Sequence, residues 1–211
     1  MRRVLYIGNK NVSSWSLRAW LALREKGVEF DERVVDFRAP ERATELAAIS
    51  PSRTVPVLHD GDLVVYDSLA IMEYANEAFP GVALLPADPR ERARARSLLA
   101  WMHSGFAEMR RGMPYEGTFR ARPVAAPDAA LRDAARAAEA WEQALTRSDG
   151  PYLFGAFSLA DITFVPVIRR LKSHGFPLAR YPRSAVWATE LMARPLVREW
   201  TAAAEALPPA T

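Results

Sequence analysis

The hydrophobic positions near the start of the chain change their spacing after the first eight residues. Residues 3–8 form an apolar run that predicts a buried strand. The apolar positions that follow recur with helical spacing up to Gly27, a residue type that commonly ends helices. Another strand is predicted over 29–35, which completes a β-α-β unit with parallel strands and a right-handed crossover.

The next hydrophobic runs predict a hairpin. Asp60-Gly61 lies between two short apolar segments and is typical of a type I′ turn, so the strands on either side are antiparallel. The order β-α-β-α-β-β-α over residues 1–79 predicts a thioredoxin-like α/β domain. The elements expected after residue 35 in this domain are a helix near 40–48, strands at 55–59 and 62–66, and a helix from Ser68 to Phe79.

The second part of the chain has helical periodicity throughout. A linker over 80–89 is bracketed by proline and carries no long periodic pattern. We therefore predict an all-α C-terminal helical domain over 87–211. Its helices are expected at about 90–112, 128–147, 158–174, 183–193 and 195–206.

Composition excludes several classes of protein. Half of the 211 residues are apolar, enough for a packed core, and the absence of cysteine excludes a disulfide scaffold and thiolate metal sites. No His, Asp and Glu cluster has the spacing of a metal site. No apolar stretch approaches the roughly 20 residues needed to cross a bilayer, and the first one ends at Gly8, too short for a signal peptide. We expect a cytoplasmic protein that binds neither metal nor membrane.

The basic character of the chain does not indicate nucleic-acid binding. Its 25 Arg and 3 Lys are mostly interleaved with acidic residues along helical stretches, which is typical of a solvated surface. Aromatic and basic residues do not alternate as they do in single-strand-binding proteins. Residues 1–79 carry 10 basic and 12 acidic side chains and residues 80–211 carry 18 and 13, so the charge also supports two domains.

Serines cluster where the first strand leads into the first helix. Ser13, Ser14 and Ser16 lie at a helix N-terminus, where free N–H groups and the positive end of the macrodipole stabilise a thiolate. Because the chain has no cysteine, such a thiol must belong to a bound small molecule, and the protein would lower its pKa from about 8.5. Serine is equally an ordinary helix cap, so the cluster alone does not decide between the two interpretations.

Two further motifs predict a peptide-binding site. A cis Val55–Pro56 bond would leave the Val55 N–H and C=O free to pair with an extended peptide, although trans is the commoner geometry. Asp67 and Ser68 are either helix caps or ligands for the ammonium and carboxylate groups of one amino acid. A γ-glutamyl group carries that pair of charges.

Together these segments resemble the glutathione transferase superfamily. Four motifs in this order cover nearly the whole chain. Residues 13–23 are similar to the catalytic-serine segment of the zeta, tau and bacterial serine-type classes. Residues 54–58 are similar to the cis-proline motif, and residues 67–71 are similar to the acidic-serine motif. Residues 157–162 are similar to the helix-capping segment with its capping box.

The resemblance implies a glutathione transferase of the kind used in detoxification, with glutathione as co-substrate. Ser13 would activate the glutathione thiolate for attack on an electrophilic carbon, with Ser14 as the alternative donor. Conjugation, isomerisation and dehalogenation share this first step. Trp15 departs from the zeta pattern, where cysteine is usual, which argues against maleylacetoacetate isomerisation as the specific reaction.

The resemblance also assigns the three parts of glutathione. Val55, held by Pro56, would pair with the cysteinyl backbone, while Asp67 and Ser68 would hold the γ-glutamyl end. Many relatives have Gly-Lys before Val-Pro, where this chain has Arg53-Thr54, so the contact with the glycyl carboxylate is left open between these two.

The electrophile pocket is expected between the domains, lined by the helix at 90–112 and the loop after it. Residues 90–122 carry 8 Arg against 3 Glu, which either favours an anionic co-substrate or marks a solvated helix face. Most of the candidate residues are of types that commonly pack in cores. The candidates are Trp101, His103, Ser104, Arg111 and Tyr115, with Met102, Phe106, Arg110 and Met113 also available.

The expected partners are a small-molecule electrophile and a second copy of the chain, in a homodimer. Two other functions are consistent with the same fold. One is a non-catalytic binding or partner protein, because a fold does not guarantee chemistry. The other is a redox enzyme that acts weakly through bound glutathione.

Overall fold

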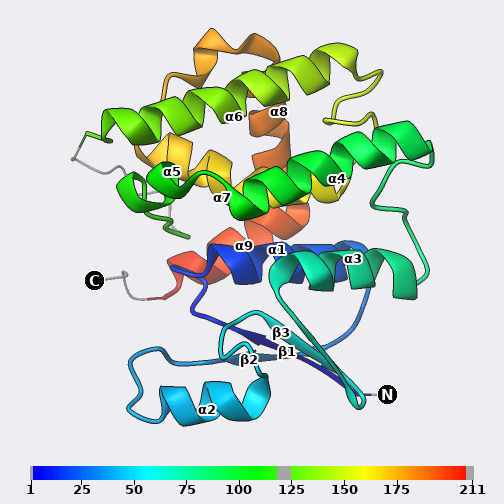
Figure 1. Ribbon diagram of the computed structural model, residues 1–211, viewed down its shortest axis with the longest axis vertical. Coiled ribbons are helices and arrows are strands. Elements are labelled where there is room, and N and C mark those ends of the chain that lie inside the picture. The colour runs from blue at the N-terminus through cyan, green and yellow to red at the C-terminus, as the bar shows by residue number, and fades with distance from the viewer. Residues whose placement is uncertain (1, 118–124, 208–211) are drawn as a thin grey trace.

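The chain forms a small mixed sheet with helices on both faces, followed by a helical half. A computed structural model describes residues 2–117 and 125–207. In Figure 1 the sheet and α2 lie at one end, α1 and α3 cover the other face of the sheet, and the later helices fill the rest of the molecule. The first half consists of β1 (Arg3–Ile7), α1 (Ser14–Glu25), β2 (Asp31–Val34), α2 (Arg42–Ile49), β3 (Val57–Asp60), β4 (Leu63–Tyr66) and α3 (Ser68–Ala78).

The sheet has the order β2-β1-β3-β4, with β1 and β2 parallel and the other neighbouring pairs antiparallel. Leu5 and Ile7 of β1 are fully buried, and α1 crosses from β1 to β2 as a β-α-β unit requires. Gly27 follows α1 with a φ of 69°, the left-handed conformation that commonly ends a helix. The predicted β-α-β unit and its end are therefore confirmed.

The hairpin exists, but its turn is not the predicted one. Asp60 pairs with Leu63, so the two loop residues are Gly61 and Asp62 rather than Asp60 and Gly61. Gly61 has a φ of 65°, and Asp62 is not among the residues with positive φ. This is the pattern of a type II′ turn, because a type I′ turn needs positive φ at both central residues.

The second half is helical. Figure 1 shows α7 in the middle of this half, and each described residue of α7 is buried except Lys172. The elements are α4 (Pro89–Ser104), α5 (Ala107–Gly112), α6 (Asp128–Arg147), α7 (Leu159–Ser173), a 3₁₀ turn (Leu178–Arg180), α8 (Pro182–Ala193) and α9 (Pro195–Glu205). The predicted fold class is thereby confirmed, and no helix of the described residues is long and apolar enough to cross a membrane.

The single helix predicted over 90–112 is wrong, because α4 ends at Ser104 and α5 begins at Ala107. Phe106 between them has a left-handed backbone with a φ of 60°. A Cβ at Gly105 would lie 2.7 Å from the carbonyl oxygen of Trp101, so only glycine fits this bend. The part of the predicted loop over 118–124 lies outside the residues that the structure describes.

The start of α7 is held by the predicted capping box. The Ser158 N–H donates to Asp161 at 2.9 Å, and the Ser158 hydroxyl donates to the same oxygen at 2.8 Å. The buried Trp187 indole also donates to Asp161, at 2.8 Å, which connects α8 to this cap. The core of the helical half is thus organised around the N-terminus of α7.

Candidate functional site

Ser13 is the N-cap of α1. Its hydroxyl accepts from the Ser16 N–H at 3.3 Å and donates to the Ser16 hydroxyl at 2.7 Å. The Ser16 hydroxyl in turn accepts from the Gly8 N–H at 3.1 Å. A hydroxyl therefore lies at the positive end of the α1 dipole, where an anionic sulfur is favoured.

Ser14 faces a different neighbour. Its hydroxyl accepts a long hydrogen bond of 3.4 Å from Arg170 on α7, and its carbonyl accepts from Arg18 at 3.3 Å. Ser13 makes its side-chain contacts within the loop and α1, whereas Ser14 contacts the helical half. The two candidate serines are thus placed in distinct surroundings.

The Val55–Pro56 peptide bond is cis. The Val55 side chain is buried in a small cluster with neighbours from α2 and β3. Neither the N–H nor the C=O of Val55 forms a hydrogen bond with any residue that the structure describes. A backbone donor and acceptor are therefore available just before β3, as the sequence predicts for pairing with an extended peptide.

Asp67 and Ser68 begin α3. Asp67 has a φ of 76°, and its Oδ1 accepts from the N–H groups of Leu69 at 2.7 Å and Ala70 at 3.4 Å. The Ser68 hydroxyl is enclosed, with the residue only 2% exposed, and it has no hydrogen-bond partner among the described residues. An unpaired buried hydroxyl at a helix N-terminus is costly unless a ligand satisfies it.

The segment before Val55 is exposed and offers a cation. Arg53 has a φ of 53°, and its guanidinium has no partner in the described part of the chain. The Thr54 hydroxyl instead donates to Ser52 at 3.0 Å. Of the two candidates for the glycyl carboxylate, Arg53 is the one with an uncommitted side chain.

The structure separates the candidates for the electrophile pocket. His103 packs edge-on against Trp15, with ring centroids 5.1 Å apart, and Tyr115 is buried beside Arg170. The other candidates contact different residues. Trp101 packs against Phe106 with tilted rings and lies under Arg136. Ser104 is exposed and donates to the Ala100 carbonyl, and Arg111 is exposed and pairs with Glu108.

Sequence reasoning named Arg110 as available for the electrophile pocket but missed the two arginines that meet it at the junction of the two halves. We call the group the arginine cluster: Arg18 of α1, Arg110 of α5 and Arg170 of α7. Arg18 and Arg110 both reach the Met102 sulfur, at 3.1 and 3.9 Å, and Arg18 and Arg170 both reach Ser14. Both Arg18 and Arg110 also lie over the Trp15 ring, 4.6 and 4.5 Å from its centroid.

Burial and mutual repulsion disfavour the charges of this cluster. Burial lowers the pKa of Arg18 well below its usual value, and the nearby charges of Arg110 and Arg170 lower it further. Burial and the Arg110 charge also lower the pKa of Arg170, to about 10, and burial lowers that of Arg110. With a pKa of about 10, Arg170 is charged at neutral pH, and arginine side chains in general keep their proton in proteins.

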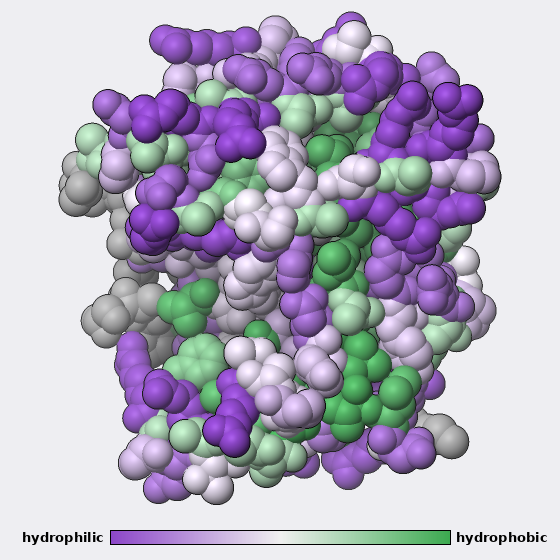
Figure 2. Space-filling view, in the orientation of Figure 1, coloured by the Kyte–Doolittle hydropathy of each residue, from purple (hydrophilic) through white to green (hydrophobic). Residues whose placement is uncertain are grey.

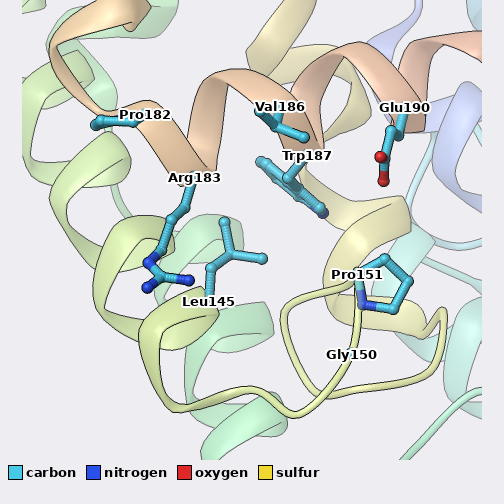
Figure 3. A pocket seen from close by; sticks show the side chains of 8 residues that line it. All are labelled: Leu145, Gly150, Pro151, Pro182, Arg183, Val186, Trp187 and Glu190. Atoms are coloured by element: carbon cyan, nitrogen blue, oxygen red, sulfur yellow. The ribbon is translucent and has the colours of Figure 1, made fainter.

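Other surface features lie apart from these residues. A pocket of about 390 Å³ lies between the end of α6, the 150–151 turn and α8, with Trp187 and Arg183 in its wall (Figure 3), and contains none of the predicted site residues. On the face of the molecule drawn in Figure 2, a strip of hydrophobic residues runs between hydrophilic side chains. Within the described ranges, no group of His, Asp and Glu could hold a metal ion.

Comparison with known proteins connects this geometry to a family. Models of the N-terminal and C-terminal domains of glutathione S-transferases match residues 12–78 and 114–203. A probable maleylacetoacetate isomerase from Caenorhabditis elegans is 30% identical over 85% of this chain and 83% of its own length. A stringent starvation protein A homologue from Pasteurella multocida is 32% identical over 85% of this chain and 79% of its own length. A glutathione transferase homologue from Burkholderia, solved with bound glutathione, has 28% identity and a TM-score of 0.76 over 98% of this chain and 100% of that one.

Proposed function

The chain belongs to the glutathione S-transferase family, and we propose that it binds glutathione and joins the glutathione sulfur to an electrophilic carbon, with Ser13 donating a hydrogen bond to the thiolate. The observation that carries the proposal is the enclosed Ser68 hydroxyl, which has no partner among the described residues. A ligand carboxylate at the α3 N-terminus would satisfy it. The Burkholderia relative solved with bound glutathione supports this ligand.

The three parts of glutathione would have separate partners in residues 1–79. Ser68 would bind the γ-glutamyl carboxylate, and Asp67 would bind the ammonium group beside it. The free N–H and C=O of Val55 would pair with the cysteinyl residue, as neighbouring strands do. The exposed guanidinium of Arg53 is the candidate for the glycyl carboxylate, and the junction with 87–211 would hold the electrophile.

The thiolate would be stabilised at the start of α1. The Ser13 hydroxyl, which now donates to Ser16 at 2.7 Å, would turn to donate to the sulfur. A hydrogen bond to a charged group contributes about 1.5–3 kcal/mol, and the α1 dipole adds to it. The thiol proton passes to solvent, and the sulfur then attacks carbon with its free electron pair to form the C–S bond. At the same time either a leaving group departs with the electron pair of the broken bond, or a π bond of the electrophile breaks and its electron pair moves to the neighbouring atom.

A second candidate function is a non-catalytic partner protein on the same fold. One relative whose name describes no transferase, the stringent starvation protein A homologue, is as similar to this chain as the isomerase relative, and the same fold can carry different functions. The pKa of the bound glutathione thiol separates the two functions. A lowered pKa supports transfer, and an unchanged pKa supports binding alone.

The active form would be a homodimer. β4 is an edge strand whose Leu63 and Tyr66 are exposed, 45% and 44% respectively, and exposed apolar edges favour association. Sedimentation at micromolar concentration should report about twice the 23.5 kDa chain mass. An active monomer would contradict this part of the proposal.

Calorimetric titration of glutathione into the purified chain tests the proposal directly. We expect saturable binding at submillimolar to millimolar glutathione and ultraviolet absorbance of a thiolate at neutral pH. S-methylglutathione, which cannot ionise at sulfur, should bind without that absorbance. If the chain does not bind glutathione at millimolar concentration, the proposed function is wrong and the partner-protein alternative is favoured.

A further inference from the structure

The three arginines of the arginine cluster form no ion pair with the residues that the structure describes. No carboxylate lies within ion-pair distance of Arg18, Arg110 or Arg170 in the described part of the chain. The segment 118–124, which the structure does not describe, contains neither Asp nor Glu in its sequence. Buried charges are normally paired, so three unpaired arginines at one junction call for an anion from outside the chain.

The hydrogen bonds of the cluster go to neutral acceptors. Arg18 donates to the carbonyls of Thr163 at 2.8 Å and Ser14 at 3.3 Å, and Arg170 donates to the Met113 carbonyl at 2.6 Å. These bonds hold the guanidinium groups in position but form no ion pair. Asp67 and Asp133 act on Arg18 and Arg110, respectively, only from beyond ion-pair distance. The cluster is therefore a preorganised positive field rather than a set of internal ion pairs.

Arg110 is the member of the cluster that has donor capacity left. Its Nε and Nη2 donate to the carbonyls that end α4, those of Gly105, Met102 and His103. Its Nη1 has no partner among the described residues, and the residue is only half-buried. Arg18 and Arg170 lie deeper, at 2% and 8% exposure.

The cluster is adjacent to the proposed thiolate site. Arg18 and Arg170 both bind Ser14, the residue after the proposed thiolate donor Ser13. The partly exposed Trp15 ring lies beside Arg18 and Arg110 and provides an apolar surface for an unsaturated or aromatic group. A substrate bound here would present its electrophilic carbon near the sulfur and its charge to the arginines.

We infer that the electrophile used by this protein carries a carboxylate group, which Arg110 binds directly while Arg18 and Arg170 supply the surrounding positive charge. The planar fork of arginine matches a carboxylate better than any other side chain does. This inference rests on the proposed function, because it concerns the second substrate of the same reaction. Arg110 is one of the eight arginines of residues 90–122, and the inference gives this arginine a role in substrate specificity.

Two matched aryl chlorides test the inference through turnover: 4-chloro-3,5-dinitrobenzoate and its neutral methyl ester. In both, a C–S bond forms at the carbon that carries chlorine, the C–Cl bond breaks and chloride leaves with the electron pair. After division by the uncatalysed rates, we expect kcat/KM to favour the carboxylate by about tenfold or more. Arg110→Gln should abolish this preference and Arg110→Lys should retain part of it. Arg94→Gln, which removes an exposed arginine of α4 paired with Glu91, should leave it unchanged.

Binding without chemistry provides the second readout. Calorimetry with 3,5-dinitrobenzoate and 3,5-dinitrobenzamide, neither of which has the chlorine, should show tighter binding of the carboxylate to the wild type with glutathione present. Equal binding of the two, or a preference that survives Arg110→Gln in a folded variant, would overturn the inference. The wild-type comparison remains decisive if Arg110→Gln does not fold. If both chlorides turn over at equal normalised rates, only the inference is contradicted. If neither chloride turns over but calorimetry still shows tighter binding of the carboxylate, only the proposed transfer reaction is contradicted.

Discussion

The His103 imidazole Nε2 lies 3.1 Å from Asp67 Oδ2, so the last turn of α4 contacts the N-cap of α3. Asp67 uses its other oxygen to cap α3, with 2.7 Å to the Leu69 N–H. The carboxylate that we assign to the glutathione ammonium therefore already has a neighbour from the helical half. Glutathione must share this oxygen with His103 or displace it, which couples the two halves at the proposed site.

Asp67→Asn tests this assignment. Asparagine retains the oxygen that caps α3 and tolerates the positive φ of 76°, but it loses the charge. We expect glutathione affinity to fall by about 1.5–3 kcal/mol, measured by calorimetry, with a much smaller change in the free energy of unfolding. The same substitution should have little effect on a glutathione analogue that lacks the γ-glutamyl amine. An equal loss for both ligands would show that Asp67 does not bind the ammonium.

His103→Phe is the matched control. Phenylalanine keeps a ring against Trp15 and removes the imidazole from Asp67. Glutathione binding should then be as tight as in the wild type or tighter. Weaker binding would show that His103 assists the ligand instead of competing with it.

The regular elements could be predicted from sequence because their signals are local. The helix predicted over 128–147 is observed with the same bounds, since its small apolar residues recur without interruption. The break at Gly105 and Phe106 could not be predicted in this way, because the apolar spacing continues across it. The reason for the glycine is a close approach to the Trp101 carbonyl, which exists only in the folded chain.

The sequence contains a signal for the arginine cluster that a count of charged residues does not reveal. Arg18, Arg110 and Arg170 have no acidic residue three or four positions away in either direction. Arg94, by contrast, has Glu91 three positions before it and pairs with it on the surface. An arginine without such a neighbour in an otherwise apolar helix is a candidate for burial, although only the structure shows that these three meet.

Ser13→Ala should reduce turnover with glutathione by about ten- to hundredfold, because one hydrogen bond to the thiolate is lost. It should also raise the pKa of the bound thiol, followed by the pH dependence of thiolate absorbance. Since Ser13 caps α1, the alanine costs about 0.5–2 kcal/mol of stability, whereas Ser13→Gly costs only a few tenths. Both variants should lose turnover equally, which separates the chemical role from the cap.

Ser14→Ala is the comparison for that experiment. Ser14 contacts Arg170 rather than the α1 cap, so its loss should leave the thiol pKa unchanged. If Ser14→Ala raises the pKa and Ser13→Ala does not, the thiolate donor is Ser14.

The N-terminus of α8 predicts a defined pH dependence of stability. Burial raises the pKa of Glu142, but hydrogen bonds from the Ser184 N–H, the Ser184 hydroxyl and the Arg183 N–H outweigh it, so the pKa is lowered. The unfolded chain then binds more protons than the folded chain in the acidic range, and stability is lost as pH falls through the folded pKa. Glu142→Gln should be less stable than the wild type at pH 7 by urea unfolding, with a difference that shrinks below about pH 4.3. Glu139→Gln on the same helix, whose side chain is exposed, should show no such difference.

Ser68→Ala should change stability and binding in opposite directions. The Ser68 hydroxyl is enclosed without a partner among the described residues, so its removal leaves the free energy of unfolding unchanged or raises it by up to about 1 kcal/mol. Glutathione loses one charge-assisted hydrogen bond but keeps the Ser68 N–H, so its affinity should fall by about 1–3 kcal/mol. Calorimetry and urea unfolding of the same preparation measure the two quantities. Ser52→Ala, which alters a hydroxyl bound within its own loop, should leave glutathione affinity within about 0.5 kcal/mol of the wild type. A Ser68→Ala variant that loses stability and binds glutathione normally would show that the hydroxyl serves the fold, and the γ-glutamyl assignment would have to move to another part of the surface.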